Sequence, residues 1–143
     1  MKRSLGDGYE LDDDQARIDV AAVHRYISEE SYWAPGREYE LQERLVREAS
    51  RVVGLYHEER QIGFCRAVAA FGLPAVYLAD VYVLTEHRGR GLGVALVEEM
   101  IERGPFADRP WFLHTGDAHE LYRRFGFEAP GPKLMERPGP RRF

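Results

Sequence analysis

The stretch of the sequence best suited to chemistry is a basic glycine loop, Arg88 to Gly93, with the sequence RGRGLG. It follows a run rich in Val and Tyr, Ala75 to Leu84, and leads into apolar residues at helical spacing from Gly91 onward. Glycines let the backbone approach a ligand closely, and a helix N-terminus offers free N–H groups and about half a positive charge. We therefore expect the loop to bind an anion such as a pyrophosphate.

Spacing separates three known ways of using such a loop. A P-loop needs Gly-x-x-x-x-Gly-Lys-Ser/Thr, and no Lys-Ser or Lys-Thr pair occurs in the sequence. The dinucleotide fingerprint could start at Gly89, but Val94 stands at its third glycine and the chain is short for that fold. The pattern Arg/Gln-x-x-Gly-x-Gly/Ala, matched by Arg88, Gly91 and Gly93, resembles the acetyl-CoA signature of the GNAT (GCN5-related N-acetyltransferase) superfamily.

A second block carries the same resemblance. A β-rich run, Trp111 to Thr115, leads into the sequence DAHELYRRFGF from Asp117 to Phe127. It is similar to a later motif of the superfamily, a strand followed by Asn-x-x-Ala-x-x-Leu-Tyr-x-x-x-Gly-Phe, in which Tyr122 occupies the Tyr position. Asp117 falls near the usual Asn beside the pantetheine arm, and with Glu120 it forms a capping-box pattern, so we expect it to cap its own helix.

The resemblance covers Ala75 to Phe127 closely and the first 70 residues only by the order of elements. There the string SYWAPGR, residues 31–37, is similar to one in an uncharacterised bacterial branch with a YWAxGR segment. The implied fold is α/β (α+β), with a mixed, mostly antiparallel central sheet that opens between its fourth and fifth strands and about four flanking helices. Residues 1–143 are expected to form one such domain.

Periodicity predicts compatible elements. Apolar residues have helical spacing from Ile18 to Glu30 and again from Glu38 to Ala49, and two Val- and Ile-rich runs that follow, Arg51 to Tyr56 and Gln61 to Ala69, indicate a β-hairpin. The segment from Phe127 to Arg137 is expected to add a last strand or two, and residues 138–143 a flexible tail. The expected order is βααβββαβαβ.

The resemblance also implies which groups hold acetyl-CoA and that no metal ion takes part. The arm lies in the opening of the sheet, where backbone groups of the fourth strand pair with it and with the thioester. Amides of the glycine loop take the pyrophosphate. The implied residues are Val81, Tyr82, Val83, Arg88, Gly89, Arg90, Gly91, Leu92, Gly93, Val94 and Asp117.

Transfer to an amine requires a neutral nucleophile, an acceptor for its proton and a donor for the departing thiolate. Tyr122 matches the residue that commonly donates this proton. Asp80 is the candidate base because a carboxylate inside an apolar strand must be paired, neutral or functional; pairing with Arg66 on the neighbouring strand is the alternative. His114 and His119 are further candidates, and an internal nucleophile at Cys65 has no supporting His or Asp nearby in sequence.

Tyr32, Trp33 and Arg37 follow the first predicted helix, where the superfamily usually places its acceptor loop. The aromatic pair is suited to stacking on an acceptor, and Arg37 to binding a carboxylate or phosphate. His114 is a fourth candidate contact. The alternative is that Trp33 plugs the loop into the core.

Composition limits the class of protein. The chain has 143 residues, 44% apolar and 31% charged, as expected of a globular domain. Its net charge of −4 gives no global field for a nucleic-acid backbone, and Cys65 as the single cysteine excludes an internal disulfide. No signal peptide or membrane span is recognisable, so we expect a cytoplasmic protein.

The function implied is transfer of acetyl from acetyl-CoA to a primary amine in a ternary complex, with a small-molecule or peptide acceptor. A different acyl-CoA on the same fold and a non-catalytic CoA-binding module remain as alternatives. Neither nucleic acid nor a membrane is an expected partner, and a homodimer is possible because many relatives dimerise.

Overall fold

A single open sheet forms the centre of the computed structural model, which describes residues 1–70, 72 and 74–139. Neighbouring strands follow the chain order and pair antiparallel, except that the last two pair in parallel. The strands are β1 (Lys2–Gly6), β2 (Tyr9–Asp12), β3 (Arg51–His57), β4 (Arg60–Val68), β5 (Val76–Val83) and β6 (Trp111–Phe112).

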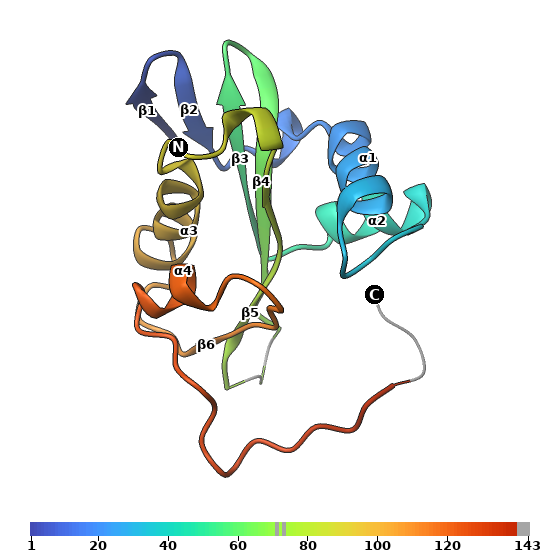
Figure 1. Ribbon diagram of the computed structural model, residues 1–143, viewed down its shortest axis with the longest axis vertical. Coiled ribbons are helices and arrows are strands. Elements are labelled where there is room, and N and C mark those ends of the chain that lie inside the picture. Colours follow the sequence, from blue (N-terminus) through green and yellow to red (C-terminus); the bar gives the residue numbers. More distant parts are fainter. Residues whose placement is uncertain (71, 73, 140–143) are drawn as a thin grey trace.

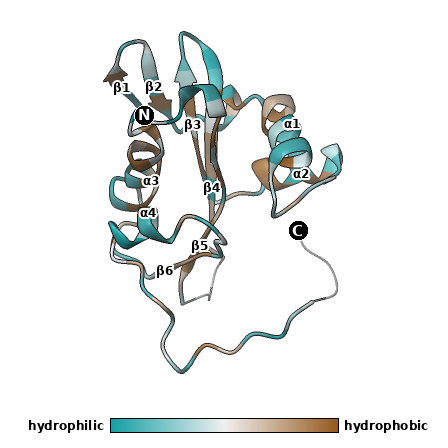
Figure 2. Cartoon of the chain, in the orientation of Figure 1, coloured by the Kyte–Doolittle hydropathy of each residue, from teal (hydrophilic) through white to brown (hydrophobic). Residues whose placement is uncertain are grey.

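Helices cover both faces of the sheet (Figure 1). On one face lie α1 (Val20–Glu30) and α2 (Tyr39–Arg47), and on the other α3 (Leu92–Glu102) and α4 (His119–Arg123). Short 3-10 turns, η1 (Gln15–Arg17) and η2 (Thr85–His87), precede α1 and follow β5. Each face has its own apolar cluster, and Figure 2 shows the hydrophobic residues concentrated on the central strands and the inward sides of the helices.

Local sequence accounts for several of these elements. Asp19 caps α1, because its side chain accepts a hydrogen bond from the Ala22 N–H at 3.0 Å. The β3–β4 hairpin turns at Glu58 and Glu59, which both have positive φ, as the tightest hairpin turns require. The predicted hairpin and the first two predicted helices are confirmed.

Two expectations about the ends of the chain are wrong. The N-terminus forms a hairpin of two strands, turning at Asp7-Gly8, a pair typical of such turns, rather than one strand. Residues 127–137 contain no strand; they are largely exposed, with prolines that cannot donate to a ladder. Of the predicted tail, residues 138 and 139 are exposed coil, and 140–143 lie outside the described residues.

The predicted cap of the last helix is also wrong. Asp117 makes no capping hydrogen bond to α4, which begins only at His119. The hydroxyl oxygen of Thr115 accepts instead from the N–H groups of Ala118 at 3.0 Å and of Asp117 at 3.4 Å. A Ser/Thr turn has therefore replaced the expected capping box.

Candidate active site

A bulge in β5 shapes the centre of the site. Phe64 pairs with Tyr82 and Arg66 with Ala79, so two residues of β5, Asp80 and Val81, lie opposite one residue of β4. Asp80 has φ of 55°, in the left-handed region that non-glycine residues seldom adopt. A bulge bends its strand and re-aims the groups that follow. The backbone from Val81 onward is therefore turned relative to the start of β5.

The sheet opens next to this bulge. Within the described residues β5 pairs with β6 at Val76 and Tyr77 only, and the two strands separate beyond that point. A cavity of about 360 Å³ lies in the opening. It is lined by Tyr26, Trp33, Val81, Tyr82, Val83, His87, Arg88, Gly89, Gly91, Leu92, Gly93, Val94, Asp117, Ala118, Leu121 and Tyr122.

The structure thus brings together the residues predicted to hold acetyl-CoA, with one exception. Ten of them line the cavity, while Arg90 does not and places its guanidinium 6.0 Å from the centre of the Tyr9 ring. The opening between β5 and β6 corresponds to the predicted gap between the fourth and fifth strands, since the additional N-terminal strand shifts the count by one.

The glycine loop forms a cradle at the start of α3. Gly91 is the N-cap of the helix and, like Gly89, has a positive φ, 76° and 81° respectively. A Cβ built on Gly89, Gly91 or Gly93 would meet no atom within 4 Å. The first amides of a helix have no partner within it, and the helix dipole favours an anion there. The space, the free amides and the dipole all fit a pyrophosphate.

The Arg88 side chain has structural partners. Its Nε donates to the Val83 carbonyl oxygen at 3.0 Å, and Nη2 donates to the hydroxyl of Tyr26 at 2.9 Å. The ring of Tyr26 stacks on Tyr82, with centroids 4.0 Å apart. Arg88 therefore fixes the loop against the end of β5 and against α1.

Tyr26 and His87 line the cavity although sequence reasoning missed both. Tyr26 is an ordinary tyrosine on a helical pattern, so no spacing marks it. His87 directly precedes the signature, and its Nδ1 lies 2.8 Å from the Tyr9 hydroxyl. Burial, with neighbouring His57, lowers the pKa of His87, which favours the neutral ring beside the loop.

Tyr122 lies on the wall of the cavity opposite the strand. It is 7% exposed and packs its ring edge-on against Phe127. Burial raises the pKa of its hydroxyl well above the usual value, so the group stays protonated at neutral pH. The hydroxyl therefore holds a proton where the predicted acid role needs one.

Asp80 is enclosed by donors. Its carboxylate accepts hydrogen bonds from Trp33 Nε1 at 3.0 Å, Arg37 Nη1 at 2.7 Å and Arg66 Nε at 2.8 Å. Burial alone would raise its pKa, but the guanidiniums of Arg66 and Arg37 outweigh it and hold that pKa below its ordinary value. The pairing with Arg66, the alternative to a base, is present, and a carboxylate stabilised in this way is a poor proton acceptor. A role as base stays a prediction.

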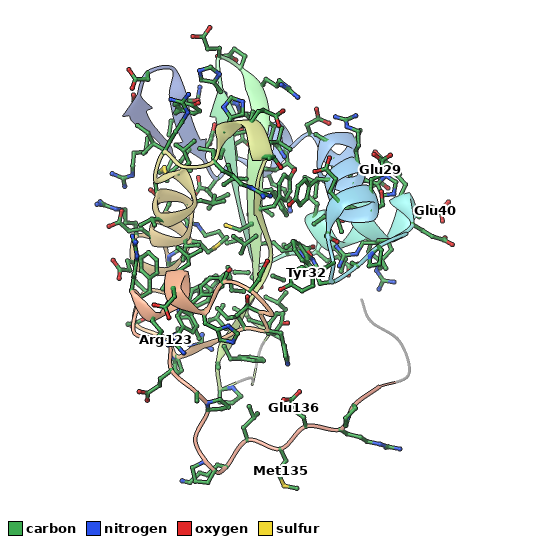
Figure 3. The ribbon with its side chains drawn as sticks, in the orientation of Figure 1. Glu29, Tyr32, Glu40, Arg123, Met135 and Glu136 are labelled. Carbon is green, nitrogen blue, oxygen red and sulfur yellow. The ribbon has the colours of Figure 1, made fainter. Side chains whose placement is uncertain are left out.

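The segment between α1 and α2 crosses the opening of the sheet. Trp33 lines the cavity, whereas the Arg37 side chain is 2% exposed and also donates to Gln42. Tyr32 is 47% exposed; its hydroxyl accepts from the Gly116 N–H at 2.7 Å and lies 3.3 Å from a carboxylate oxygen of Asp117. Figure 3 shows Tyr32 on the side of the α1–α2 pair that faces the sheet.

The remaining candidates lie away from the cavity. His114 is exposed, with Nδ1 2.8 Å from the Tyr77 hydroxyl and Nε2 3.5 Å from Glu136. His119 is exposed at the start of α4. Cys65 is fully buried, and burial raises the pKa of its thiol, so it does not form a thiolate.

Comparisons with known proteins agree with this geometry. Residues 48–129 match the family model described as acetyltransferase (GNAT) domain. A protein assigned to the GNAT family from Xanthomonas campestris pv. campestris is 34% identical, with a TM-score of 0.83 over 92% of this chain and 94% of that one. The chain therefore belongs to the GNAT family of acetyltransferases, a family that uses acetyl-CoA.

More distant structures share the fold. A protein from Clostridium acetobutylicum solved with acetyl-CoA is 12% identical, with a TM-score of 0.67 over 96% of each chain. Glucosamine-6-phosphate N-acetyltransferase from Arabidopsis thaliana is also 12% identical, with a TM-score of 0.61 over 90% of this chain and 97% of that one. No curated protein sequence matches the chain significantly.

The described residues contain neither a membrane-spanning helix nor a metal-binding group of side chains. None of their helices combines the length and apolar character needed to cross a bilayer. Their His, Cys, Asp and Glu side chains form no group of three or more that could hold a metal ion.

Proposed function

We propose that the protein transfers the acetyl group of acetyl-CoA to a primary amine by direct attack in a ternary complex. The observation that carries this proposal is the cavity between β5 and β6, which has an anion cradle at one end and the protonated hydroxyl of Tyr122 on its wall. These are the two features that a thioester donor with a diphosphate requires.

In this proposal acetyl-CoA extends along the whole cavity. The pyrophosphate would lie against the amides from Arg88 to Val94, with the arm running along β5. The edge of β5 beyond Tyr77 is free of β6, which leaves backbone groups of Val81 and the N–H of Val83 for the arm and the thioester, while the Val83 carbonyl oxygen accepts from Arg88. Backbone recognition of this kind depends on strand position, so it is insensitive to the side chains.

The chemistry follows from the groups at hand. The lone pair of the neutral amine attacks the thioester carbonyl carbon and the C–S bond breaks. The nitrogen, now bonded to the acetyl group, releases its extra proton to water or to a second group, and the thiolate takes a proton from Tyr122. Alkyl amines have a pKa of about 10.4, so the amine must lose a proton to become a nucleophile. That proton passes to water or to a second group. Tyr122 then recovers its proton from solvent.

The acceptor is assigned to the side of the cavity occupied by the segment between α1 and α2. Trp33 lines the cavity there, and Tyr32 lies next to it with an exposed ring. Their aromatic faces suit a small-molecule or peptide amine. Arg37 is excluded as a direct anion contact in this proposal, since its guanidinium is buried against Asp80.

A transfer assay tests the proposal. Purified protein is incubated with acetyl-CoA and a panel of amines that includes amino acids, polyamines, amino sugars and peptides, while CoA release and product mass are followed. We expect at least one N-acetylated product in stoichiometric yield with CoA, strongly reduced in Tyr122→Phe. Full turnover in Tyr122→Phe would remove the acid role. No acetylated product and no CoA release from any amine would contradict the proposal.

A further inference from the structure

Asp80 occupies a costly position for a residue without an evident chemical role. It adopts φ of 55°, and its carboxylate is 1% exposed and pairs with two guanidiniums, those of Arg37 and Arg66. The cluster thus carries one excess positive charge in the interior. Buried ion pairs and left-handed non-glycine residues generally disfavour the folded state. Their coincidence at the bulge points to a function.

The cluster joins two segments that are distant in sequence. Trp33 and Arg37 come from the segment between α1 and α2, 47 and 43 residues away from Asp80, and both donate to its carboxylate. Arg66 anchors the carboxylate from the neighbouring strand at 2.8 Å. Since one side chain receives bonds from both, moving either segment displaces the carboxylate.

Both ends of this connection reach the same cavity. Val81, which follows Asp80 directly, lines the cavity from β5, and Trp33 lines it from the opposite segment. In the proposed function the first holds the thioester through its backbone and the second lies on the acceptor side. Asp80 therefore directly precedes Val81, the residue proposed to hold the acetyl donor, and it is hydrogen-bonded to Trp33 in the acceptor loop, which we define as residues 31–37.

We propose that Asp80 is a positioning residue that couples the acceptor loop to the backbone holding the thioester. This inference rests on the proposed function, because it concerns how the two substrates are aligned. Alignment of reacting atoms contributes strongly to transfer rates, so a rigid connection between the two binding segments has a direct use. Asp80 acts through Trp33 and Val81 and does not itself accept the proton of the amine.

Hydrogen exchange tests the connection without knowledge of the acceptor. Exchange of amides in residues 31–37 is measured with and without saturating acetyl-CoA in wild type, Asp80→Asn and the control Arg44→Met, which breaks an exposed pair with Glu48. We expect acetyl-CoA to slow exchange of the loop at least threefold in wild type and in the control. In Asp80→Asn the ligand-free loop should exchange at least tenfold faster, with no slowing by acetyl-CoA.

Other outcomes identify which idea fails. Equal loop exchange in wild type and Asp80→Asn, or slowing by acetyl-CoA that persists in the variant, would overturn the coupling. If wild type does not bind acetyl-CoA at all, the proposed function fails, and the ligand-free comparison still shows whether Asp80 holds the loop. Should Asp80→Asn not fold, Arg37→Met replaces it, because this variant leaves Asp80 and Arg66 as a balanced pair.

With an acceptor in hand, the same residue distinguishes positioning from base catalysis. Asp80→Asn should raise the KM for the amine about tenfold or more and leave the acidic limb of the pH–rate profile in place. Loss of that limb with an unchanged KM would mean that Asp80 is the base and would overturn the inference.

Discussion

Replacing Gly93 by Glu should separate folding from donor binding. Gly93 lies in the first turn of α3 and lines the cavity, and a Cβ there meets no atom within 4 Å. Glu is a better helix former than Gly by roughly 0.5 kcal/mol, and an acidic residue at a helix N-terminus adds about 0.3–1 kcal/mol. We therefore expect the ligand-free variant to be about 1 kcal/mol more stable than wild type.

The same carboxylate should repel the pyrophosphate. Two unit charges 4 Å apart interact with about 1 kcal/mol in water and about 4 kcal/mol at a protein surface. A diphosphate with two charges would thus lose at least about 2 kcal/mol, or roughly 30-fold in affinity. One substitution should then raise the midpoint of urea unfolding and weaken acetyl-CoA binding.

Urea unfolding and calorimetric titration of acetyl-CoA measure the two effects on the same preparations. Gly93→Gln has nearly the same size without the charge and should lose much less affinity. Gly126→Ala lies at another positive-φ glycine, φ 85°, outside the cavity, and should lose stability but keep affinity. Wild-type affinity in Gly93→Glu, or equal losses in the Glu and Gln variants, would refute an anion cradle at this loop.

Four further outcomes are expected. Tyr122→Phe should keep acetyl-CoA affinity in calorimetry while kcat falls by about 10². Glu99→Gln removes the 1% exposed carboxylate that pairs with buried Arg51 at 3.4 Å; because Arg51 keeps Asp13 at 3.1 Å, urea unfolding should show a loss of about 1–3 kcal/mol. Cys65 in the native protein should resist iodoacetamide at pH 8 and react only after unfolding, because burial raises its pKa. The pKa of Asp80 is lower in the folded than in the unfolded protein, where it is about 3.9, so its ionisation stabilises the fold fully above that unfolded pKa. This stabilisation is lost as the pH falls through the folded pKa, and the unfolding free energies of wild type and Asp80→Asn should therefore approach each other only below about pH 4.

Local signals made the proposed donor side of the cavity predictable. The glycine loop, its preceding strand and the helix after it are contiguous, so the order of elements and the residues of the cradle can be read from the sequence alone. The exception, Arg90, shares the composition of the loop but turns toward Tyr9. Residue type in a loop does not determine which side chains face the ligand.

Long-range contacts made the proposed acceptor side of the cavity less predictable. Because Asp80 is a carboxylate in an apolar strand, the sequence indicates that it needs a partner. Arg66 could be predicted as that partner because it lies on the adjacent strand. Arg37 reaches Asp80 only through the packing of α1 and α2 on the sheet, which no spacing reveals. The bulge that gives Asp80 its φ of 55° is likewise a property of strand pairing.

The N-terminal hairpin and the start of α4 were predicted wrongly for a different reason. The Asp7-Gly8 turn is a strong hairpin signal, but the flanking strands are short and charged, which hides their alternation. Near Asp117 the Thr115 hydroxyl accepts from the N–H groups of Asp117 and Ala118, and α4 begins one residue later than a helix capped by Asp117 would. Weak local preferences of this kind are settled by geometry.

The central claim is that acetyl-CoA lies between β5 and β6, and a crystal structure of the protein grown with acetyl-CoA tests it most directly. We predict density for the pyrophosphate against the amides from Arg88 to Val94 and for the thioester beside Val81, with the sulfur within reach of the Tyr122 hydroxyl. Acetyl-CoA bound elsewhere, or absent at saturating concentration, would contradict the account.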